Sequence, residues 1–182
     1  MKALIVYADG FEDVEALATR DVLVRAGIEV YDAKINEGED LVISSHKVAL
    51  SGFKTLKNVN LSEFAAIIIP GGSRGVNNLL QSAQVSELIK EFYKNDKLVC
   101  AICAGPMVLN KAGILANHRF TCYPGCEEGL AGSYTGEEVV VDHKLVTARS
   151  MLYSIPFGLA IIELLLGSTV KEKIYHQIAG LR

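Results

Sequence analysis

Two segments of the chain, residues 2–7 (KALIVY) and 65–70 (AAIIIP), consist almost entirely of apolar residues. Continuous apolar runs of this length are typical of strands that are covered on both faces, as in a parallel sheet. Residues 28–33 (IEVYDA) and 97–102 (KLVCAI) are predicted as two further strands. The pattern therefore indicates a sheet whose central strands are buried.

A helix is predicted between the first two strands, over residues 12–27, and it ends at Gly27 as many helices do. A strand–helix–strand unit with short connections implies that its two strands run parallel. Helical spacing places apolar side chains on one side of this helix, at Val14, Leu17, Ala18, Val22 and Leu23.

The remaining chain continues the alternation with two interruptions. Residues 41–52 are interpreted as two short strands, with a hairpin at the sheet edge as one arrangement. Residues 138–148 predict a hairpin that turns at Asp142-His143. Further helices are expected over about 85–95, 104–113 and 154–166. This order predicts a doubly wound, flavodoxin-like α/β fold, whose ligands bind outside the carboxyl ends of the parallel strands.

Length and composition narrow the functional classes. The 182 residues suit one domain over 1–182, and the formal charge of −3 gives no reason to expect nucleic acid or a membrane as partner. The most apolar stretch, IPFGLAIIELLLG, contains Glu163 and is shorter than a membrane span, so a buried helix is predicted. No signal peptide is recognised, and the four cysteines suggest reduced thiols in a cytoplasmic protein.

Cys103 stands where the strand 97–102 must turn directly into the next helix. Small residues follow it, Ala104 and Gly105, as in a nucleophile elbow that presents a side chain at the sheet edge. The helix that begins with Pro106 would favour a thiolate through its dipole. We therefore predict a reactive Cys103; the alternative is a small thiol that only fills the core.

Cys100 precedes Cys103 by three residues, which raises the question of a redox-active pair. In a strand the two side chains would point to opposite faces, with Cα atoms about 10 Å apart, too far for a disulfide. We predict that Cys100 is packed in the core.

Glu15 lies on the first predicted helix, on the side that carries Ala18 and Val22. A carboxylate on an apolar side costs free energy unless a function requires it. Beside a thiolate, burial and like charge would raise its pKa, and it would donate a hydrogen bond to the sulfur. The alternative places Glu15 at the solvent edge of the helix. Glu12 and Asp13 are interpreted as ordinary charges of a helix start.

The turn PGGSRG, residues 70–75, follows the strand 65–70. It lacks the lysine of a P-loop, so a phosphate cradle is less favoured than a turn whose glycines, Gly71 and Gly72, let backbone N–H groups approach a ligand. Together with the N–H of Ala104, such groups would form an oxyanion hole.

The histidines are scattered, at positions 46, 118, 143 and 176, and leave Cys103 without an obvious base. The spacing of His118, Cys122 and Cys126 matches no common zinc site. We expect no metal and no other cofactor.

The runs AAIIIPGGSRGVNNLLQS, VCAICAGPMVL and VVVDHKLVTARS, followed by an apolar helix, resemble the ThiJ/PfpI superfamily nearly end to end. Within it, the chain is most similar to the branch of the parkinsonism-associated deglycase and its bacterial relatives. The resemblance implies that Cys103 is reactive and oxidises to sulfinic acid, that a protonated Glu15 hydrogen-bonds its sulfur, and that Gly72 supplies a backbone donor. It also implies a homodimer through the first helix, with Asp21 and Arg25 near the interface.

Three positions depart from that family. Tyr123 stands where one branch has a histidine near the cysteine, and Ala104 stands where the protease branch has a histidine. The resemblance therefore does not imply protease activity. His46 replaces a family arginine and could reach the site of a neighbouring subunit.

Two functional hypotheses follow. In the first, Cys103 and Glu15 act, with weak activity, on 2-oxoaldehydes or glycated groups, as a glutathione-independent glyoxalase or deglycase does. The partners would be small reactive carbonyl compounds or glycated proteins. In the alternative, the protein is an oxidative-stress sensor or redox-regulated chaperone in which Cys103 oxidises to sulfinic acid.

Overall fold

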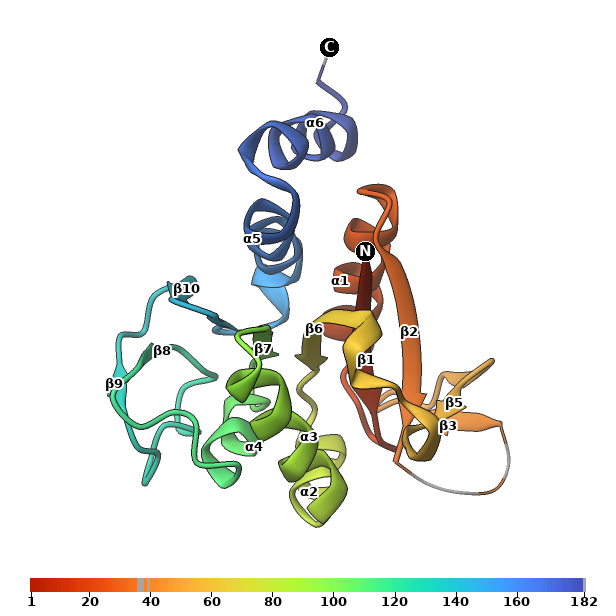
Figure 1. The fold of residues 1–182 in the computed structure, drawn as a ribbon, viewed down its shortest axis with the longest axis vertical. Helices are drawn as coiled ribbons and strands as arrows, with labels where there is room; N and C mark the ends of the chain where they lie inside the picture. Colours follow the sequence, from red (N-terminus) through yellow and green to blue (C-terminus); the bar gives the residue numbers. More distant parts are fainter. Residues whose placement is uncertain (36–37, 39, 182) are drawn as a thin grey trace.

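The computed structural model describes residues 1–35, 38 and 40–181 (Figure 1), and a seven-stranded sheet forms its centre. From edge to edge the strand order is β10-β11-β7-β6-β1-β2-β5. The strands are β1 (Lys2–Tyr7), β2 (Glu29–Lys34), β5 (Lys54–Thr55), β6 (Phe64–Ile69), β7 (Leu98–Ile102), β10 (Val139–Asp142) and β11 (Leu145–Ala148).

Every neighbouring pair in this sheet is parallel except β10 with β11. The run β2-β1-β6-β7-β11 is the flavodoxin-like order, in which the chain crosses from one half of the sheet to the other between β1 and β6. The predicted α/β class is confirmed. Ligands of such sheets bind at this switch point, at the carboxyl ends of the strands.

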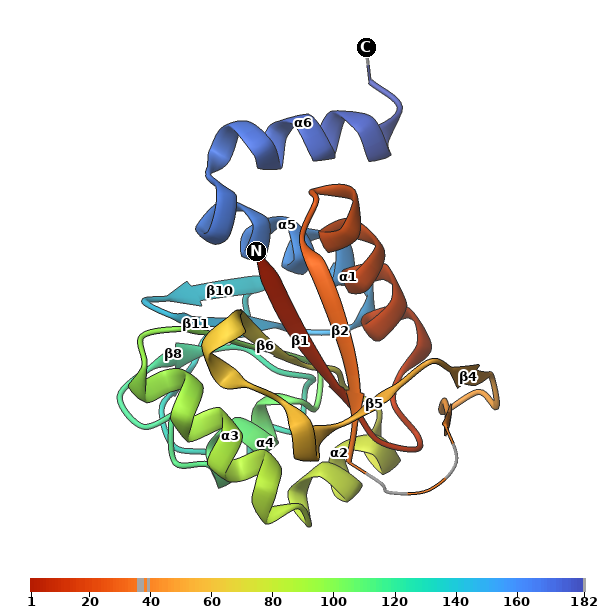
Figure 2. The ribbon, with the colours of Figure 1, turned by 45° about the vertical axis from the view of Figure 1, so that its right-hand side comes forward.

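Helices cover both faces of the sheet. Figure 2 shows α1 and α5 on one side, and α2, α3 and α4 on the other. Their bounds are α1 (Asp13–Arg25), α2 (Ser73–Leu80), α3 (Ala83–Lys94), α4 (Pro106–Lys111), α5 (Ser154–Leu166) and α6 (Ser168–Ala179). Short 3₁₀ turns occupy Leu56–Asn58, Leu61–Glu63 and Met151–Tyr153.

The two faces of the sheet carry separate apolar cores because successive residues of a strand point to opposite sides. On β1, Leu4 belongs to the core under α2–α4, whereas Ile5 belongs to the core under α1 and α5. Both side chains are fully buried, which explains the uninterrupted apolar run in the sequence. The apolar runs are thus a direct consequence of two-sided covering.

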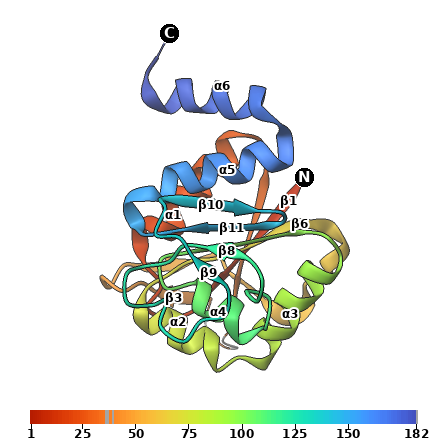
Figure 3. The ribbon, with the colours of Figure 1, turned by 90° about the vertical axis from the view of Figure 1, so that its left-hand side faces the viewer.

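The C-terminal helix α6 is the outermost element, beyond α5 (Figure 3). Helix α5 is only partly the buried helix that the sequence predicts: Phe157, Ile161 and Ile162 are buried, but Glu163 is exposed and pairs with Lys171 of α6. None of the helices formed by the described residues is long and apolar enough to cross a membrane.

The predicted apolar side of α1 is partly wrong. Val14 and Leu17 are 44% and 38% exposed, and the buried positions are Glu15, Ala16, Thr19, Val22 and Leu23. The helix is rotated because it packs closely on α5: a Cβ added at Gly158 of α5 would lie 3.1 Å from Val22. Val22 and the backbone of Thr19 face this contact, and Val14 and Leu17 face outward.

Three further details differ from the sequence-based expectations. The hairpin of β3 (Leu41–Ile43) and β4 (Ala49–Ser51) forms its own two-stranded sheet instead of extending the edge of the main one. Helix α2 was not predicted, because its two asparagines and Gly75 weaken the apolar pattern. Helix α4 ends at Lys111 and is shorter than expected.

The predicted hairpin over 138–148 is confirmed as β10 and β11. Two strands of two residues each, β8 (Arg119–Phe120) and β9 (Ser133–Tyr134), form a small separate parallel pair.

Candidate active site

Cys103 occupies a sharp turn between β7 and α4. Its φ of +62° is in the left-handed region, which a residue with a Cβ adopts at a cost of about 1–2 kcal/mol. Its N–H donates to the carbonyl of Ala148 on β11 at 2.8 Å, and its carbonyl accepts from the N–H of Tyr123 at 2.9 Å. The backbone of Cys103 is therefore held from both sides in the geometry predicted for an elbow.

Glu15 follows β1, Cys103 follows β7, and the two side chains come into contact where the chain crosses between the halves of the sheet. It lies in the first turn of α1 and is 1% exposed. The Gly71 N–H, just after β6, donates to its Oε2 at 2.8 Å, and a hydrogen bond joins the carboxyl to the Cys103 thiol. Three strand ends thus supply Glu15, Gly71 and Cys103, as the sequence predicts.

The position of α1 depends on Glu12, which the sequence analysis treated as an ordinary charge. Its carboxylate accepts the Glu15 N–H at 2.7 Å and caps the helix, while its own N–H donates to the Gly71 carbonyl at 3.0 Å. The sequence signal for this capping role was an acidic residue, Glu12, three positions before the buried Glu15. Glu12 thereby fixes α1 to the turn after β6.

Only glycine fits at position 71. A Cβ there would lie 2.3 Å from Oε2 of Glu15 and 2.8 Å from the Cβ of Cys103. The first of these separations is shorter than any real contact, so a side chain would separate the carboxyl from the thiol. Gly71 is therefore required for the contact between the two ionisable groups.

Burial raises the pKa of Glu15 to about 7, and the negative charge of Glu12 adds to the shift, against hydrogen bonds from Cys103 and Gly71. Burial also raises the pKa of the Cys103 thiol, as does the adjacent Glu15 carboxylate, whereas the Ala104 N–H lowers it by donating to the sulfur. Two negative charges side by side are unfavourable here. A thiolate on Cys103 is consequently favoured when Glu15 holds a proton, so that the pair carries one negative charge.

This constellation can be compared with known proteins. The family model described as DJ-1/PfpI matches residues 1–164. The chain belongs to the DJ-1/PfpI family. It is 35% identical over 182 residues to dj-1beta of Drosophila melanogaster, covering 98% of this chain and 95% of that protein. It is 33% identical over 152 residues to a deglycase of Pyrococcus abyssi, covering 82% and 90%.

Solved structures agree with this assignment to the DJ-1/PfpI family. The crystal structure of Drosophila DJ-1beta superposes with a TM-score of 0.91 at 31% identity, over 100% of this chain and 98% of that one. Toxoplasma gondii DJ-1, solved in an oxidized form, gives a TM-score of 0.87 at 31% identity, over 98% and 97%.

Cys100 and Cys103, the two cysteines considered as a redox-active pair, differ in their exposure to solvent. Cys100 is fully buried in the core beneath α1 and α5, as predicted, and Cys103 is partly exposed at the strand end. The expectation that the two point to opposite faces is wrong: Cys103 lies past the end of β7 in a left-handed turn and packs against the same core. All four cysteines are free. The backbone N–H of Tyr123 donates to the Cys103 carbonyl, and the Tyr123 side chain is 51% exposed.

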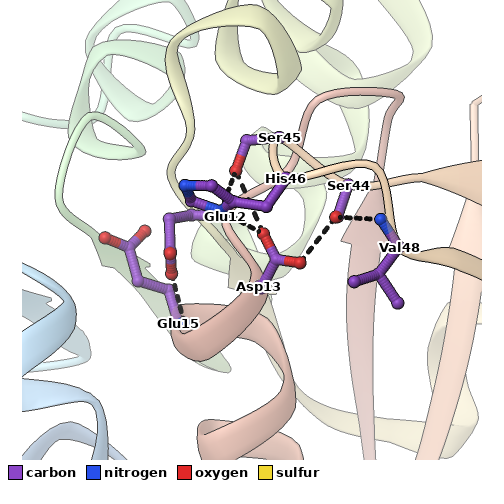
Figure 4. Close-up of polar contacts among 7 residues, drawn as sticks. All are labelled: Glu12, Asp13, Glu15, Ser44, Ser45, His46 and Val48. Carbon is purple, nitrogen blue, oxygen red and sulfur yellow. Dashed lines mark hydrogen bonds and ion pairs between the residues drawn. The ribbon is translucent and has the colours of Figure 1, made fainter.

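His46 lies on the β3–β4 hairpin, close to the start of α1 (Figure 4). Its Nδ1 is 2.8 Å from Oδ2 of Asp13, and the hydroxyls of Ser44 and Ser45 donate to the same carboxylate at 2.6 and 3.1 Å. Burial opposes ionisation of Asp13, but these hydrogen bonds lower its pKa to about 2. Asp13 therefore fastens the hairpin to α1, while Glu15 points to the opposite side.

Among the described residues, ligand atoms of Glu12, Asp13 and His46 lie within 4.8 Å of one another and could hold a cation. Glu12 and Asp13 are already engaged in the hydrogen bonds described above.

Asp21 and Arg25 form an exposed ion pair of 2.6 Å within α1. His118 binds Tyr93 and Asp142, so it does not join Cys122 and Cys126.

The raised pKa of Glu15 predicts how stability depends on pH. The folded protein keeps this carboxyl protonated up to about pH 7, whereas the unfolded chain ionises near the ordinary value of 4.5. The free energy of unfolding should therefore fall as pH rises through this window and level off above it. Glu15→Gln carries no such charge, so its stability relative to the wild type should increase by about 2 kcal/mol from about pH 5 to about pH 8.

Urea unfolding of both proteins at the two pH values measures this difference. Parallel stability profiles of Glu15→Gln and the wild type would contradict the prediction.

Proposed function

We propose that the protein is a cysteine-dependent enzyme that acts on 2-oxoaldehydes or on glycated groups. The observation that carries this proposal is the buried Glu15 carboxyl hydrogen-bonded to Cys103 at the elbow. An acid that shares one proton with a thiol can both release a thiolate and move protons on a bound substrate.

The first step is addition of the Cys103 sulfur to the aldehyde carbon of a 2-oxoaldehyde such as methylglyoxal. The S–C bond forms, the carbonyl π bond breaks, and the new oxyanion takes a proton to give a hemithioacetal. Backbone N–H groups of Gly72 and Ala104 are proposed to stabilise that oxyanion.

Glu15 then acts as the proton shuttle. Its carboxylate removes the proton from the former aldehyde carbon to give an enediol and returns it to the adjacent carbon, which leaves a thioester. Water hydrolyses the thioester to the 2-hydroxy acid and frees the thiol. Methylglyoxal and one water thus give lactate without glutathione.

Deglycation would use the same attack on an early adduct between an aldehyde and an amine or thiol. The Pyrococcus abyssi relative is named a deglycase, which supports this substrate class. The decisive experiment measures lactate from methylglyoxal in the absence of glutathione, for the wild type and for Cys103→Ser.

A second candidate function is oxidation sensing through the same cysteine. Cys103 is partly exposed beside an acid that can donate a hydrogen bond to an oxidised sulfur, and the Toxoplasma gondii relative was solved in an oxidized form. A sensor of this kind needs no turnover of a carbonyl substrate.

We also propose that two copies associate through α1. The exposed side of this helix carries an apolar stripe at helical spacing, Val14, Leu17 and Val24, each at least 38% exposed. The hairpin fastened to α1 by Asp13 adds Ile43 and Val48, which are 40% and 44% exposed. An apolar surface that spans two elements is typical of an interface between subunits.

Leu17→Glu should therefore convert a dimer into a monomer, because it places a charge at the centre of the stripe. Sedimentation velocity measures the change. Leu181→Glu is the matched control, since Leu181 is 53% exposed but lies beyond α6. An unchanged sedimentation coefficient for Leu17→Glu would exclude this interface.

A further inference from the structure

Cys126 has no role in the function proposed above, yet the chain brings it back towards Cys103. The N–H of Tyr123 donates to the Cys103 carbonyl at 2.9 Å. This hydrogen bond attaches the segment that contains Cys126 directly to the elbow. Only Pro124 and Gly125 therefore separate Cys126 from Tyr123, a residue in backbone contact with Cys103.

The four residues from Tyr123 to Cys126 form a tight turn. The Cys126 N–H donates to the Tyr123 carbonyl at 2.9 Å, and Gly125 has a φ of +92°. Proline followed by a glycine of positive φ is the sequence of a type II turn, which keeps the Cα atoms of its first and last residues within about 7 Å. Cys126 is thus folded back beside Tyr123 and does not extend away from the site.

Exposure distinguishes Cys126 from the two other cysteines. Cys100 and Cys122 are 0% exposed, whereas Cys103 and Cys126 are both partly exposed. A negative charge on Cys126 would raise the pKa of Cys103 and that of Cys122, so exposure, not proximity, is what distinguishes Cys103 from Cys122 as its partner. The same oxidant can therefore reach both thiols from solvent.

We propose that Cys126 is the resolving thiol of Cys103, so that peroxide converts the pair into a disulfide before Cys103 proceeds to sulfinic acid. The inference rests on the reactivity of Cys103 proposed above and adds a reversible oxidised state to that site. The turn that carries Cys126 lies in a segment without helix or strand, between β8 and β9, so bringing the Cα atoms within the roughly 4.4–6.8 Å of a disulfide displaces no helix or strand.

The reaction is balanced in two steps. The Cys103 thiolate attacks one oxygen of a hydroperoxide; an S–O bond forms, the O–O bond breaks, and the leaving oxygen is protonated from Glu15. The Cys126 thiolate then attacks the sulfenic sulfur; an S–S bond forms, the S–O bond breaks, and hydroxide leaves as water after protonation. Two thiols are oxidised and one peroxide is reduced. A dithiol restores both cysteines.

The test treats the full chain with one equivalent of hydrogen peroxide, blocks the remaining thiols with a maleimide, and records the intact mass. The wild type should lose two hydrogens and bind two maleimides fewer than the reduced protein, and a dithiol should reverse both changes. Cys126→Ser should instead gain one oxygen at this dose, and in a peroxide titration it should reach the sulfinic acid, with two added oxygens, at a lower dose than the wild type needs.

Cys122→Ser is the matched control and should behave as the wild type does. The variants are needed because trypsin leaves Cys100 with Cys103 in peptide 98–111, and Cys122 with Cys126 in peptide 120–144. A disulfide that survives in Cys126→Ser, or two added oxygens at the same dose in the wild type and Cys126→Ser, would overturn the proposal.

The result of this disulfide test is independent of whether the protein converts carbonyl substrates. Failure of the disulfide with normal lactate formation would refute only the role of Cys126. Disulfide formation without any lactate would refute only the enzymatic proposal. Circular dichroism of Cys126→Ser verifies that the half-buried position tolerates the serine.

Discussion

Cys103→Ser should reduce lactate formation from methylglyoxal at least about a thousandfold, because a serine hydroxyl in this site has no base that makes it an equivalent nucleophile. The substitution keeps the size of the side chain and its left-handed backbone. The loss would therefore be a loss of chemistry and not of structure. The measurement is the initial rate of lactate production without glutathione, with proton exchange at the product carbon followed by NMR.

Cys100→Ala provides the matched control. It removes the other thiol of the same stretch, which lies in the core and not at the strand end. It should cost some stability but retain turnover. Equal rates for the wild type and Cys103→Ser would remove Cys103 from the reaction.

Glu15→Gln tests the second half of the mechanism. The amide oxygen can still accept the Gly71 N–H, but the amide cannot carry a proton between two carbons. Loss of the shuttle should cost about a hundredfold to ten-thousandfold in turnover. A variant that forms the hemithioacetal but releases no lactate would locate the defect at the enediol step.

Gly72→Ala should lower the free energy of unfolding by at least about 3 kcal/mol. Gly72 has a φ of +92°, and an added Cβ would lie 2.4 Å from the Gly10 carbonyl oxygen and 2.6 Å from the Glu12 nitrogen. Both atoms belong to the backbone between β1 and α1, so neither can move like the end of a flexible side chain. The strain would fall on the segment that positions Glu15.

Gly113→Ala is the control that separates the cost of a positive φ from the cost of a steric clash with the added Cβ. Gly113 has a φ of +78° but no atom within 4 Å of an added Cβ. Its free energy of unfolding should fall by only about 1 kcal/mol, the cost of an alanine in the left-handed backbone region. Urea unfolding of the two variants gives both values, and equal losses would show that the close approach at Gly72 contributes nothing.

The sequence alone determined the sheet and the strand ends that hold the chemistry. An apolar run such as 65–70 predicts a strand covered on both faces whatever covers it, because the requirement is local. The elbow was likewise predictable, since small residues after Cys103 permit a turn that larger ones would prevent. The geometry of a strand did not predict the side of Cys103, because β7 ends at Ile102 and the left-handed turn brings Cys103 against the same core as Cys100.

Tertiary structure decided which side of α1 is buried, how the hairpin is attached, and what meets Cys103. Periodicity shows that a helix has an apolar side, but Val14 and Leu17 fit that pattern as well as the residues that pack on α5. The pairing of Glu15 with Gly71 and Cys103 joins three strand ends distant in sequence. The same holds for the bonds from Asp13 to Ser44 and His46. Such contacts depend on the relative placement of whole elements, which the packing of both cores determines and no local pattern encodes.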